Sequence, residues 1–249
     1  MNPLVVLVGT KISGNIGAVA RGMKNMGFER LALADPAANH LNREAMDRAM
    51  EGRSILQEAK VYPGLKEAVS ECQRVVGTSG KLRNSPVPLI APRELAEKYS
   101  KAPGDQWALV FGPEDTGLKN DDLILCDTLI NIPTAPELTS LNISHAVMVV
   151  LYELFIISFS PPEGAPLGLG EGARRVDEGE RPPVITASQR ESLFAHWQEA
   201  LLHIGFLDPK NPARIMDDIR HIFNRAGLNL READILRGIA RQILNRCQR

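Results

Sequence analysis

The sequence has few cysteines, and no pattern links them. Its 3 Cys lie far apart, at positions 72, 126 and 247, and they form no CxxC or Cys/His spacing. This excludes a disulfide framework and a zinc site, and it is typical of a reducing compartment. We therefore expect a cytoplasmic protein without a metal.

Neither an excess of one charge nor a long apolar run is present. Lys plus Arg number 29 and Asp plus Glu 30, so only a local patch could bind nucleic acid. The apolar run Ala146–Ile157 is interrupted by Glu153 and is shorter than the roughly 20 residues of a membrane span. We expect a buried helix here, in the core or at a subunit interface, and no membrane partner. Met1–Gly9 lacks the basic region and the cleavage site of a signal peptide.

Hydrophobic residues make up 44% and aromatic residues 5%, which predicts a globular protein with an aliphatic core. Strand-like runs alternate with helical ones. The predicted strands are Leu4–Val8, Arg30–Leu33, Arg74–Thr78, Trp107–Phe111 and Thr128–Ile132. The predicted helices are Asn15–Gly27, Asn42–Ala59, Leu65–Ser70, Pro92–Tyr99 and Ser140–Phe159. This alternation predicts an α/β fold with a mostly parallel sheet covered by helices.

The composition changes at Ser160. Residues 160–183 are rich in Pro, Gly and charge, which predicts a flexible linker. The following residues predict three helices, with Ser188 as a cap and Gly205 and Gly227 as stops. This last part carries ten basic and seven acidic side chains, counted over residues 184–249. We expect a first domain at 1–160, a linker at 161–183 and a small helical domain at 184–249.

Ligands of parallel sheets bind at the carboxyl ends of the strands. Three segments at predicted strand ends mix Gly or Pro with small polar residues: GTKISGNIGAVAR (9–21), FGPEDTGL (111–118) and IPTAPELTSLNIS (132–144). No GxGxxG is present, and Gly77–Lys81 lacks P-loop spacing, which disfavours a nucleotide-dependent oxidoreductase. One such loop alone would be an ordinary turn, but three together predict a site.

The first segment opens a helix whose apolar stripe is Ile16, Ala20, Met23 and Gly27. Arg21 lies about 140° from Ile16 around this helix, off the stripe. Alone, Arg21 would be a solvated side chain and Asn15 an N-cap. The Gly- and Asn-rich helix start, however, leaves amide N–H groups open to an anion.

NIGAVARGMKNMG, FGPEDTGL and IPTAPELTSLNISHAV resemble, in order and spacing, the three motifs of the SPOUT-class RNA 2′-O-ribose methyltransferases. The TrmJ-like tRNA enzymes are the most similar group. The resemblance covers about residues 1–160, and the linker and helical domain fit the same layout. It implies a SPOUT fold with a trefoil knot, S-adenosyl-L-methionine (AdoMet) as cofactor, and a homodimer with the active site at the subunit interface.

The resemblance also implies roles for particular residues. Those matched to the catalytic motifs are Arg21, Asn15, Glu114, Ser140 and Asn142. Those placed at the cofactor are Thr78, Ser79, Gly112, Ile132 and Leu141, and Arg83 is placed at the RNA. Many TrmJ-like sequences carry Arg where this chain has Pro113, so a role for that Arg side chain is lost, although the backbone turn is compatible with Pro.

The implied reaction moves a methyl group from AdoMet to a ribose 2′-OH of tRNA, in the anticodon-loop region at position 32, and requires no metal. A guanidinium stays protonated in proteins, so we expect Arg21 to hold a phosphate and to stabilise the alkoxide rather than to act as a base. Ser140 and Asn142 would orient the hydroxyl or Arg21, and Glu114 would accept from Asn15 or Arg21. We expect His145 to be a core residue.

Other functions remain open. The target can be rRNA or another tRNA site, which the motifs do not distinguish. A knotted RNA-binding protein without catalysis is a further alternative, disfavoured by the intact Asn15, Arg21, Ser140 and Asn142.

Overall fold

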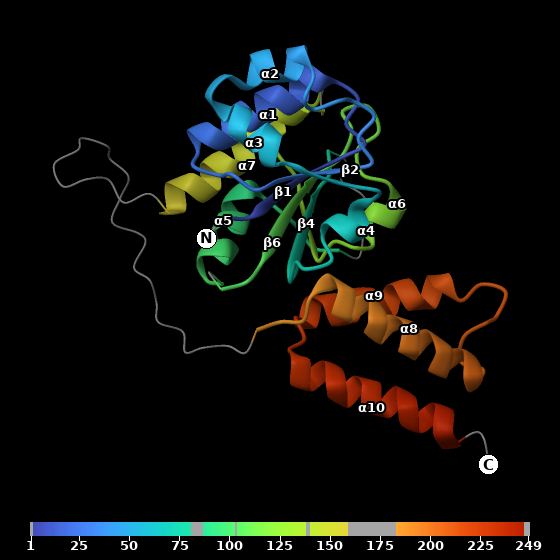
Figure 1. Cartoon of the computed structure of the whole chain (residues 1–249). Helices are drawn as coiled ribbons and strands as arrows, with labels where there is room; N and C mark the ends of the chain where they lie inside the picture. Colours follow the sequence, from blue (N-terminus) through green and yellow to red (C-terminus); the bar gives the residue numbers. More distant parts are fainter. Residues whose placement is uncertain (1, 81–86, 103, 138–139, 159–182, 247–249) are drawn as a thin grey trace.

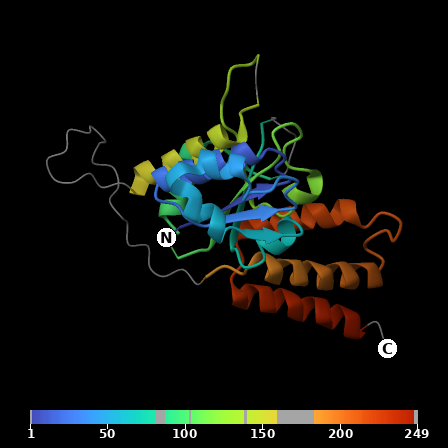
Figure 2. The ribbon, with the colours of Figure 1, turned by 45° about the horizontal axis from the view of Figure 1, so that its top comes forward.

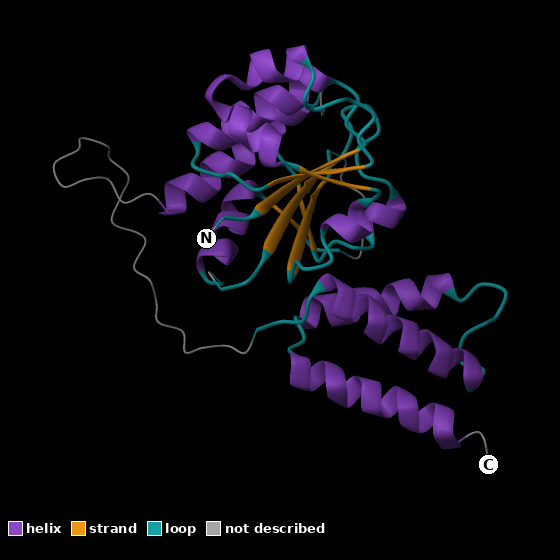
Figure 3. Ribbon diagram, in the orientation of Figure 1, coloured by secondary structure: helices purple, strands orange, loops and turns teal. Residues whose placement is uncertain are grey.

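A single parallel sheet forms the centre of the first part of the molecule. The computed structural model describes residues 2–80, 87–102, 104–137, 140–158 and 183–246. Its seven strands run in the order β3-β2-β1-β6-β4-β7-β5, and every neighbouring pair is parallel. Figure 3 shows the strands, in orange, gathered among the helices. The strands are β1 (Leu4–Val8), β2 (Leu31–Ala34), β3 (Lys60–Tyr62), β4 (Arg74–Thr78), β5 (Leu89–Ile90), β6 (Trp107–Phe111) and β7 (Thr128–Ile130). The predicted parallel α/β sheet is confirmed.

The central strands match their predictions because they are buried on both faces and have continuous apolar sequences. β1, β4 and β6 have the predicted bounds, whereas β2 is shifted by one residue and β7 ends two residues early. The sequence analysis missed β3 and β5, which are the two edges of the sheet. Both are short, and Val61 and Leu89 are exposed, so no buried apolar run marks them.

Helices cover both faces of the sheet (Figure 1). One face carries α1 (Ser13–Asn25), α2 (Arg43–Ala49), α3 (Arg53–Glu58), α5 (Pro92–Ser100) and α7 (Ile143–Ser158). The other carries the short α4 (Leu65–Ala68) and α6 (Asn120–Leu123). Alternate strand residues serve the two cores: Val5 and Leu7 pack with the first set, and Val6 and Val8 with the second. The core is aliphatic, as expected.

The predicted helix over 42–59 is divided, which corrects that expectation. Met50 takes a positive φ of 50°, and a 3₁₀ turn, η1 (Met50–Gly52), separates α2 from α3. At this division the backbone of Gly52 lies close to the backbone of Ala20 in α1. A Cβ added to Gly52 would lie only 2.5 Å from the Ala20 carbonyl oxygen. Gly17 makes a similar approach from α1, since its Cβ would lie 2.2 Å from the Ala45 carbonyl oxygen. Tertiary packing thus overrides the local helical pattern.

Helix α7 contains the apolar run of the sequence. Val147, Val150, Leu151 and Leu154 are buried, and the helix packs against α1 and α5. Its outer face is different: Val149 and Tyr152 are exposed, and His145 is exposed as well. The expectation of a core histidine is therefore wrong, because His145 lies on this outer face. Among the described residues, no helix is long and apolar enough to cross a membrane.

Three further helices follow, as predicted: α8 (Ala187–His203), α9 (Ala213–Ala226) and α10 (Leu230–Arg246). Gly205 and Gly227 follow α8 and α9 with φ of +72° and +62°, so both predicted stops are confirmed. The cap of α8 is Thr186, whose hydroxyl accepts from the Gln189 amide, and not Ser188. The predicted linker lies outside the described residues except for position 183.

Candidate active site

The ends of three neighbouring strands bring predicted site residues to one edge of the sheet. β6, β4 and β7 are consecutive in the sheet, so Gly112, Thr78 and Ile132 lie at or just after adjacent carboxyl ends. The Thr78 hydroxyl donates to the Val110 carbonyl (3.2 Å), which fastens β4 to β6. The Ser79 amide donates to the Ile130 carbonyl (2.9 Å), which continues the pairing of β4 with β7. Figure 2 shows residues 131–137, which follow β7, extending beyond these strand ends.

The loop after β6 folds back tightly on itself. A Cβ on Gly112 would lie 2.4 Å from the Leu118 amide nitrogen, so this position requires glycine. The Gly117 amide donates to the Pro113 carbonyl (2.8 Å), and Gly117 has a φ of +65°. The turn therefore accommodates Pro113, as expected. A surface ion pair between Lys11 and Asp115 (2.6 Å) links this loop to the one after β1.

Residues of all three sequence segments meet in one hydrogen-bonded group. The Asn15 side-chain amide, in the first turn of α1, donates to the Glu114 carboxylate. The Asn142 amide donates to the Asn15 side-chain oxygen (3.1 Å). The structure thus connects residues that are 99 and 127 positions apart in the chain. The expectation that Glu114 accepts from Asn15 is confirmed, and the expectation of Asn15 as an N-cap is wrong, because α1 begins two residues earlier.

The same group contains a residue that the sequence analysis missed. The Asn142 side-chain oxygen accepts from both the amide (2.9 Å) and the hydroxyl (2.7 Å) of Ser144. Asn142 therefore caps α7, and Ser140, which precedes the helix and is exposed, does not. The only sequence signal for Ser144 is its place two residues after an Asn at a helix start, a spacing typical of local Asn-to-backbone bonds.

Arg21 is near this group in sequence but is not bonded to it. It lies six residues after Asn15 on α1, about 9 Å further along the axis and about 120° away around it. Its side chain is exposed, as the helical geometry predicted, and it has no hydrogen bond or ion pair with the described residues. Ile16, Ala20 and Met23 are fully buried, so most of the predicted stripe is confirmed, but Gly27 is exposed beyond the helix.

Two of the remaining predicted residues offer apolar contacts. Ile132 and Leu141 are half-buried, and Ile132 packs against the core beneath α1 and α7. Arg83, predicted to contact RNA, lies outside the described residues. In the ranges that the structure describes, no three His, Cys, Asp or Glu side chains are placed to hold a metal ion.

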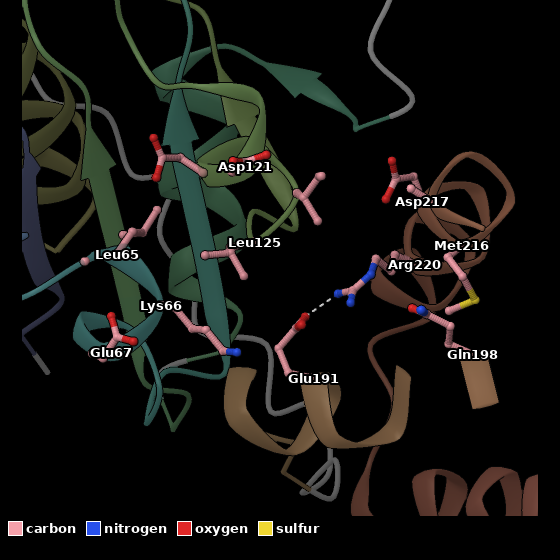
Figure 4. Close-up of a pocket in the computed structure, with 14 residues that line it drawn as sticks. Leu65, Lys66, Glu67, Asp121, Leu125, Glu191, Gln198, Met216, Asp217 and Arg220 are labelled. Carbon is pink, nitrogen blue, oxygen red and sulfur yellow. Dashed lines mark hydrogen bonds and ion pairs between the residues drawn. The ribbon is translucent and has the colours of Figure 1, made fainter. Parts of the chain in front are cut away.

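A cavity of about 440 Å³ lies away from these strand ends, between α4 and α6 on one side and α8 and α9 on the other (Figure 4). Its lining combines apolar residues with acidic ones, among them Glu67, Asp121 and Asp217, and Arg220 pairs with Glu191. None of the predicted site residues lines it. The strand ends, and not this cavity, carry the candidate site.

Comparison with known proteins identifies the class. The model of the SpoU rRNA Methylase family matches residues 2–152, and the chain belongs to this family. A second model, that of the C-terminal domain of the tRNA methyltransferase TrmJ, matches residues 188–249.

Individual proteins are similar over nearly the whole chain. The tRNA (cytidine/uridine/adenosine-2′-O-)-methyltransferase TrmJ of Pseudomonas aeruginosa is 39% identical, covering 94% of this chain and 91% of that protein. The tRNA (cytidine/uridine-2′-O-)-methyltransferase TrmJ of Klebsiella pneumoniae is 36% identical, covering 97% and 96%. The crystal structure of TrmJ from Z. mobilis superposes with a TM-score of 0.81 at 28% identity, covering 98% of this chain and 99% of the other.

Proposed function

We propose that this protein is an AdoMet-dependent methyltransferase that methylates a ribose 2′-OH in tRNA. The observation that carries the proposal is the bonded group of Asn15, Glu114 and Asn142, which three distant segments build at the start of α1, the helix that also carries Arg21. The similarity to tRNA 2′-O-methyltransferases over nearly the whole chain supports the same reaction. The resemblance of the three motifs to the TrmJ-like enzymes supports a target in the anticodon-loop region, at position 32, as part of this proposal.

The residues at the strand ends fit AdoMet, which is a nucleoside without phosphate. Such a ligand needs apolar contacts for its base and hydrogen bonds from backbone and hydroxyl groups, and no glycine-rich phosphate cradle. Thr78, Ser79, Gly112 and Ile132 offer these at the strand ends, and Leu141, which directly precedes Asn142, is assigned with them. When bound, the cofactor supplies a methyl carbon that its sulfonium activates.

Two exposed side chains, Arg21 and Ser140, can donate hydrogen bonds to the RNA substrate. The exposed Arg21 guanidinium is suited to bind an RNA phosphate in a bidentate manner and to stabilise negative charge that develops on the 2′-oxygen. Ser140, also exposed, orients the ribose hydroxyl. Glu114 holds Asn15 in place through their hydrogen bond. The contribution of these residues is alignment of the attacking oxygen with the methyl carbon.

We propose a homodimer whose subunit interface includes the outer face of α7 and borders the active site. Val149 is 37% and Tyr152 49% exposed on this otherwise apolar helix, and an apolar face of this kind is buried when two copies associate. The site residue Asn142 lies directly before the same helix.

The domain boundaries at 1–160 and 184–249 are also proposed, with a linker between them. Separate apolar clusters within α8, α9 and α10 support the second domain. The trefoil knot of the SPOUT fold is proposed from membership of the SpoU family. Cys72 and Cys126 are free thiols, which supports a cytoplasmic location. Arg83 is assigned to RNA by the resemblance alone.

The test is transfer of labelled methyl from AdoMet to a panel of purified RNAs. We expect label on unmodified tRNA and none on the same tRNA synthesised with a deoxyribose at the target position. Label on rRNA alone would keep the chemistry but change the substrate. A protein that binds tRNA but transfers no label to any RNA would overturn the proposal in favour of a binding protein without catalysis.

A further inference from the structure

The hydrogen bonds of Ser144 determine which way the Asn142 side chain faces. An amide side chain has one accepting and one donating end, and the two ends have nearly the same shape. A backbone N–H only donates, so the Ser144 amide selects the oxygen end of Asn142 at 2.9 Å. The Ser144 hydroxyl then gives that oxygen its second hydrogen bond, at 2.7 Å.

This orientation passes along the group. With its oxygen turned to Ser144, Asn142 presents its nitrogen to the Asn15 oxygen at 3.1 Å. Asn15 is thereby turned so that its own nitrogen faces Glu114, to which it donates. A carboxylate only accepts hydrogen bonds, so Glu114 requires the nitrogen end of Asn15, just as the Ser144 amide requires the oxygen end of Asn142. Both requirements orient the two Asn side chains in the same way.

The direction decides what the group can offer to a substrate. A carbonyl oxygen has two lone pairs, and both lone pairs of the Asn142 oxygen are taken by Ser144. Asn142 can therefore offer a substrate only an N–H. One of its two amide hydrogens is bonded to Asn15, and the second is not used in that bond. Asn142 is exposed, so this N–H is accessible. A donor is what an oxygen that gains negative charge requires.

We infer that Ser144 is a positioning residue of the methyl-transfer site. Its amide selects the oxygen end of Asn142, and its hydroxyl occupies the second lone pair of that oxygen, so that Asn142 meets the substrate oxygen only as a hydrogen-bond donor and stays aligned with Asn15 and Glu114. The inference rests on the proposed function. Helix capping alone does not account for the hydroxyl, because the backbone amide of Ser144 already satisfies the cap.

The experiment compares Ser144→Ala with the wild type and with Ser144→Thr in steady-state methylation of tRNA. Ser144→Ala removes the hydroxyl and keeps the backbone bond. We expect kcat to fall about tenfold, which corresponds to the loss of one hydrogen bond, while KM for tRNA stays within about twofold. Ser144→Thr, which keeps a hydroxyl, is expected to restore kcat to within about threefold of the wild type.

Ser158→Ala is the matched control. Ser158 lies at the other end of the same helix, and its hydroxyl donates to the Leu154 carbonyl at 2.9 Å. This variant loses a hydroxyl bond of α7 without touching the Asn142 group, so we expect its kcat to be unchanged. If both alanine variants lower kcat equally, the effect belongs to helix stability and the inference is wrong.

A second readout does not depend on catalysis. In ¹H–¹⁵N NMR spectra of the full chain, the side-chain NH₂ signals of Asn142 and Asn15 should move toward free-amide positions in Ser144→Ala and stay in place in Ser158→Ala. Unchanged NH₂ signals or an unchanged kcat in Ser144→Ala would overturn the inference. A wild-type protein without methyl transfer would instead overturn the proposed function, and the NMR result would still report on the alignment.

Discussion

Arg190 of α8 forms an ion pair with Asp127, 3.1 Å away at the start of β7, and both side chains are about nine-tenths buried. The Arg190 guanidinium also donates to the Gln73 carbonyl (3.0 Å), and the Asp127 carboxylate accepts from the Val75 amide (2.7 Å). This group fastens the C-terminal helices to the amino-terminal side of β4 and β7, opposite to the candidate site.

Removing one partner of this pair is expected to be costly. Arg190→Ala leaves the Asp127 carboxylate buried without its counter-charge, so we expect the free energy of unfolding to fall by about 3–5 kcal/mol. Urea denaturation measures the change. The control is Arg43→Ala, since Arg43 is 95% exposed in its pair with Asp47 and should contribute less than about 1 kcal/mol. Equal small losses in both variants would contradict the assignment.

The same pair predicts a pH dependence of stability. Burial raises the pKa of Asp127, and the Arg190 guanidinium and the Val75 amide oppose this only in part. The native carboxyl therefore holds its proton to a higher pH than the unfolded one, whose pKa is about 3.9. Its contribution to stability is complete below that pH and is lost as pH rises through the native pKa.

An Asn side chain stays uncharged at every pH. We therefore expect the stability of Asp127→Asn not to fall as pH rises through the native pKa of Asp127. Denaturation midpoints of the wild type and the variant, measured from pH 4 upward, should converge at the acid end and separate as pH rises. Parallel profiles would show that Asp127 does not titrate differently in the native state.

Close packing of α1 against α2 is expected to be sensitive to one methyl group. Gly17→Ala would place its Cβ 2.2 Å from the Ala45 carbonyl oxygen, so the two helices must separate. We expect a loss of about 1–3 kcal/mol in the free energy of unfolding. Gly238→Ala in α10 meets nothing within 4 Å and should instead stabilise by about 0.5–1 kcal/mol. A Gly17→Ala variant as stable as the wild type would contradict the packing described.

The buried thiols are expected to be unreactive. Burial raises the pKa of Cys72 to about 11 and also raises the pKa of Cys126. The thiolate is the nucleophile, so neither residue should be alkylated by iodoacetamide in the native protein at neutral pH. Peptide mapping after labelling measures this, and the same reaction in denaturant should label both. Rapid native labelling of Cys72 would show that the core beneath α4 opens.

The sequence predicts those features that depend on local pattern. Leu4–Val8 and Trp107–Phe111 are strands because continuous apolar runs fit a sheet covered on both faces, and Gly205 and Gly227 end helices because they take positive φ. The division of the helix at Met50 was not predictable, since it follows from the approach of Gly52 to Ala20 in the folded chain.

The site shows the same division. The motif resemblance selects Asn15, Glu114 and Asn142, which the fold brings together. Helical spacing alone separates Arg21 from Asn15 on α1. The sequence does not indicate that Ser144 completes the group, because this depends on where α7 begins. The pairing of Arg190 with Asp127 joins α8 to the start of β7, 63 positions away in the chain, and no local sequence pattern indicates it.

The most direct test of the account is nucleoside mass spectrometry of tRNA incubated with AdoMet and either the wild type or Arg21→Ala. We expect 2′-O-methylated nucleosides with the wild type and a kcat at least about a hundredfold lower with Arg21→Ala, because a donor to the developing charge is lost. AdoMet binding by calorimetry should stay within about threefold. Methylation on a base, or normal turnover by Arg21→Ala, would contradict the account.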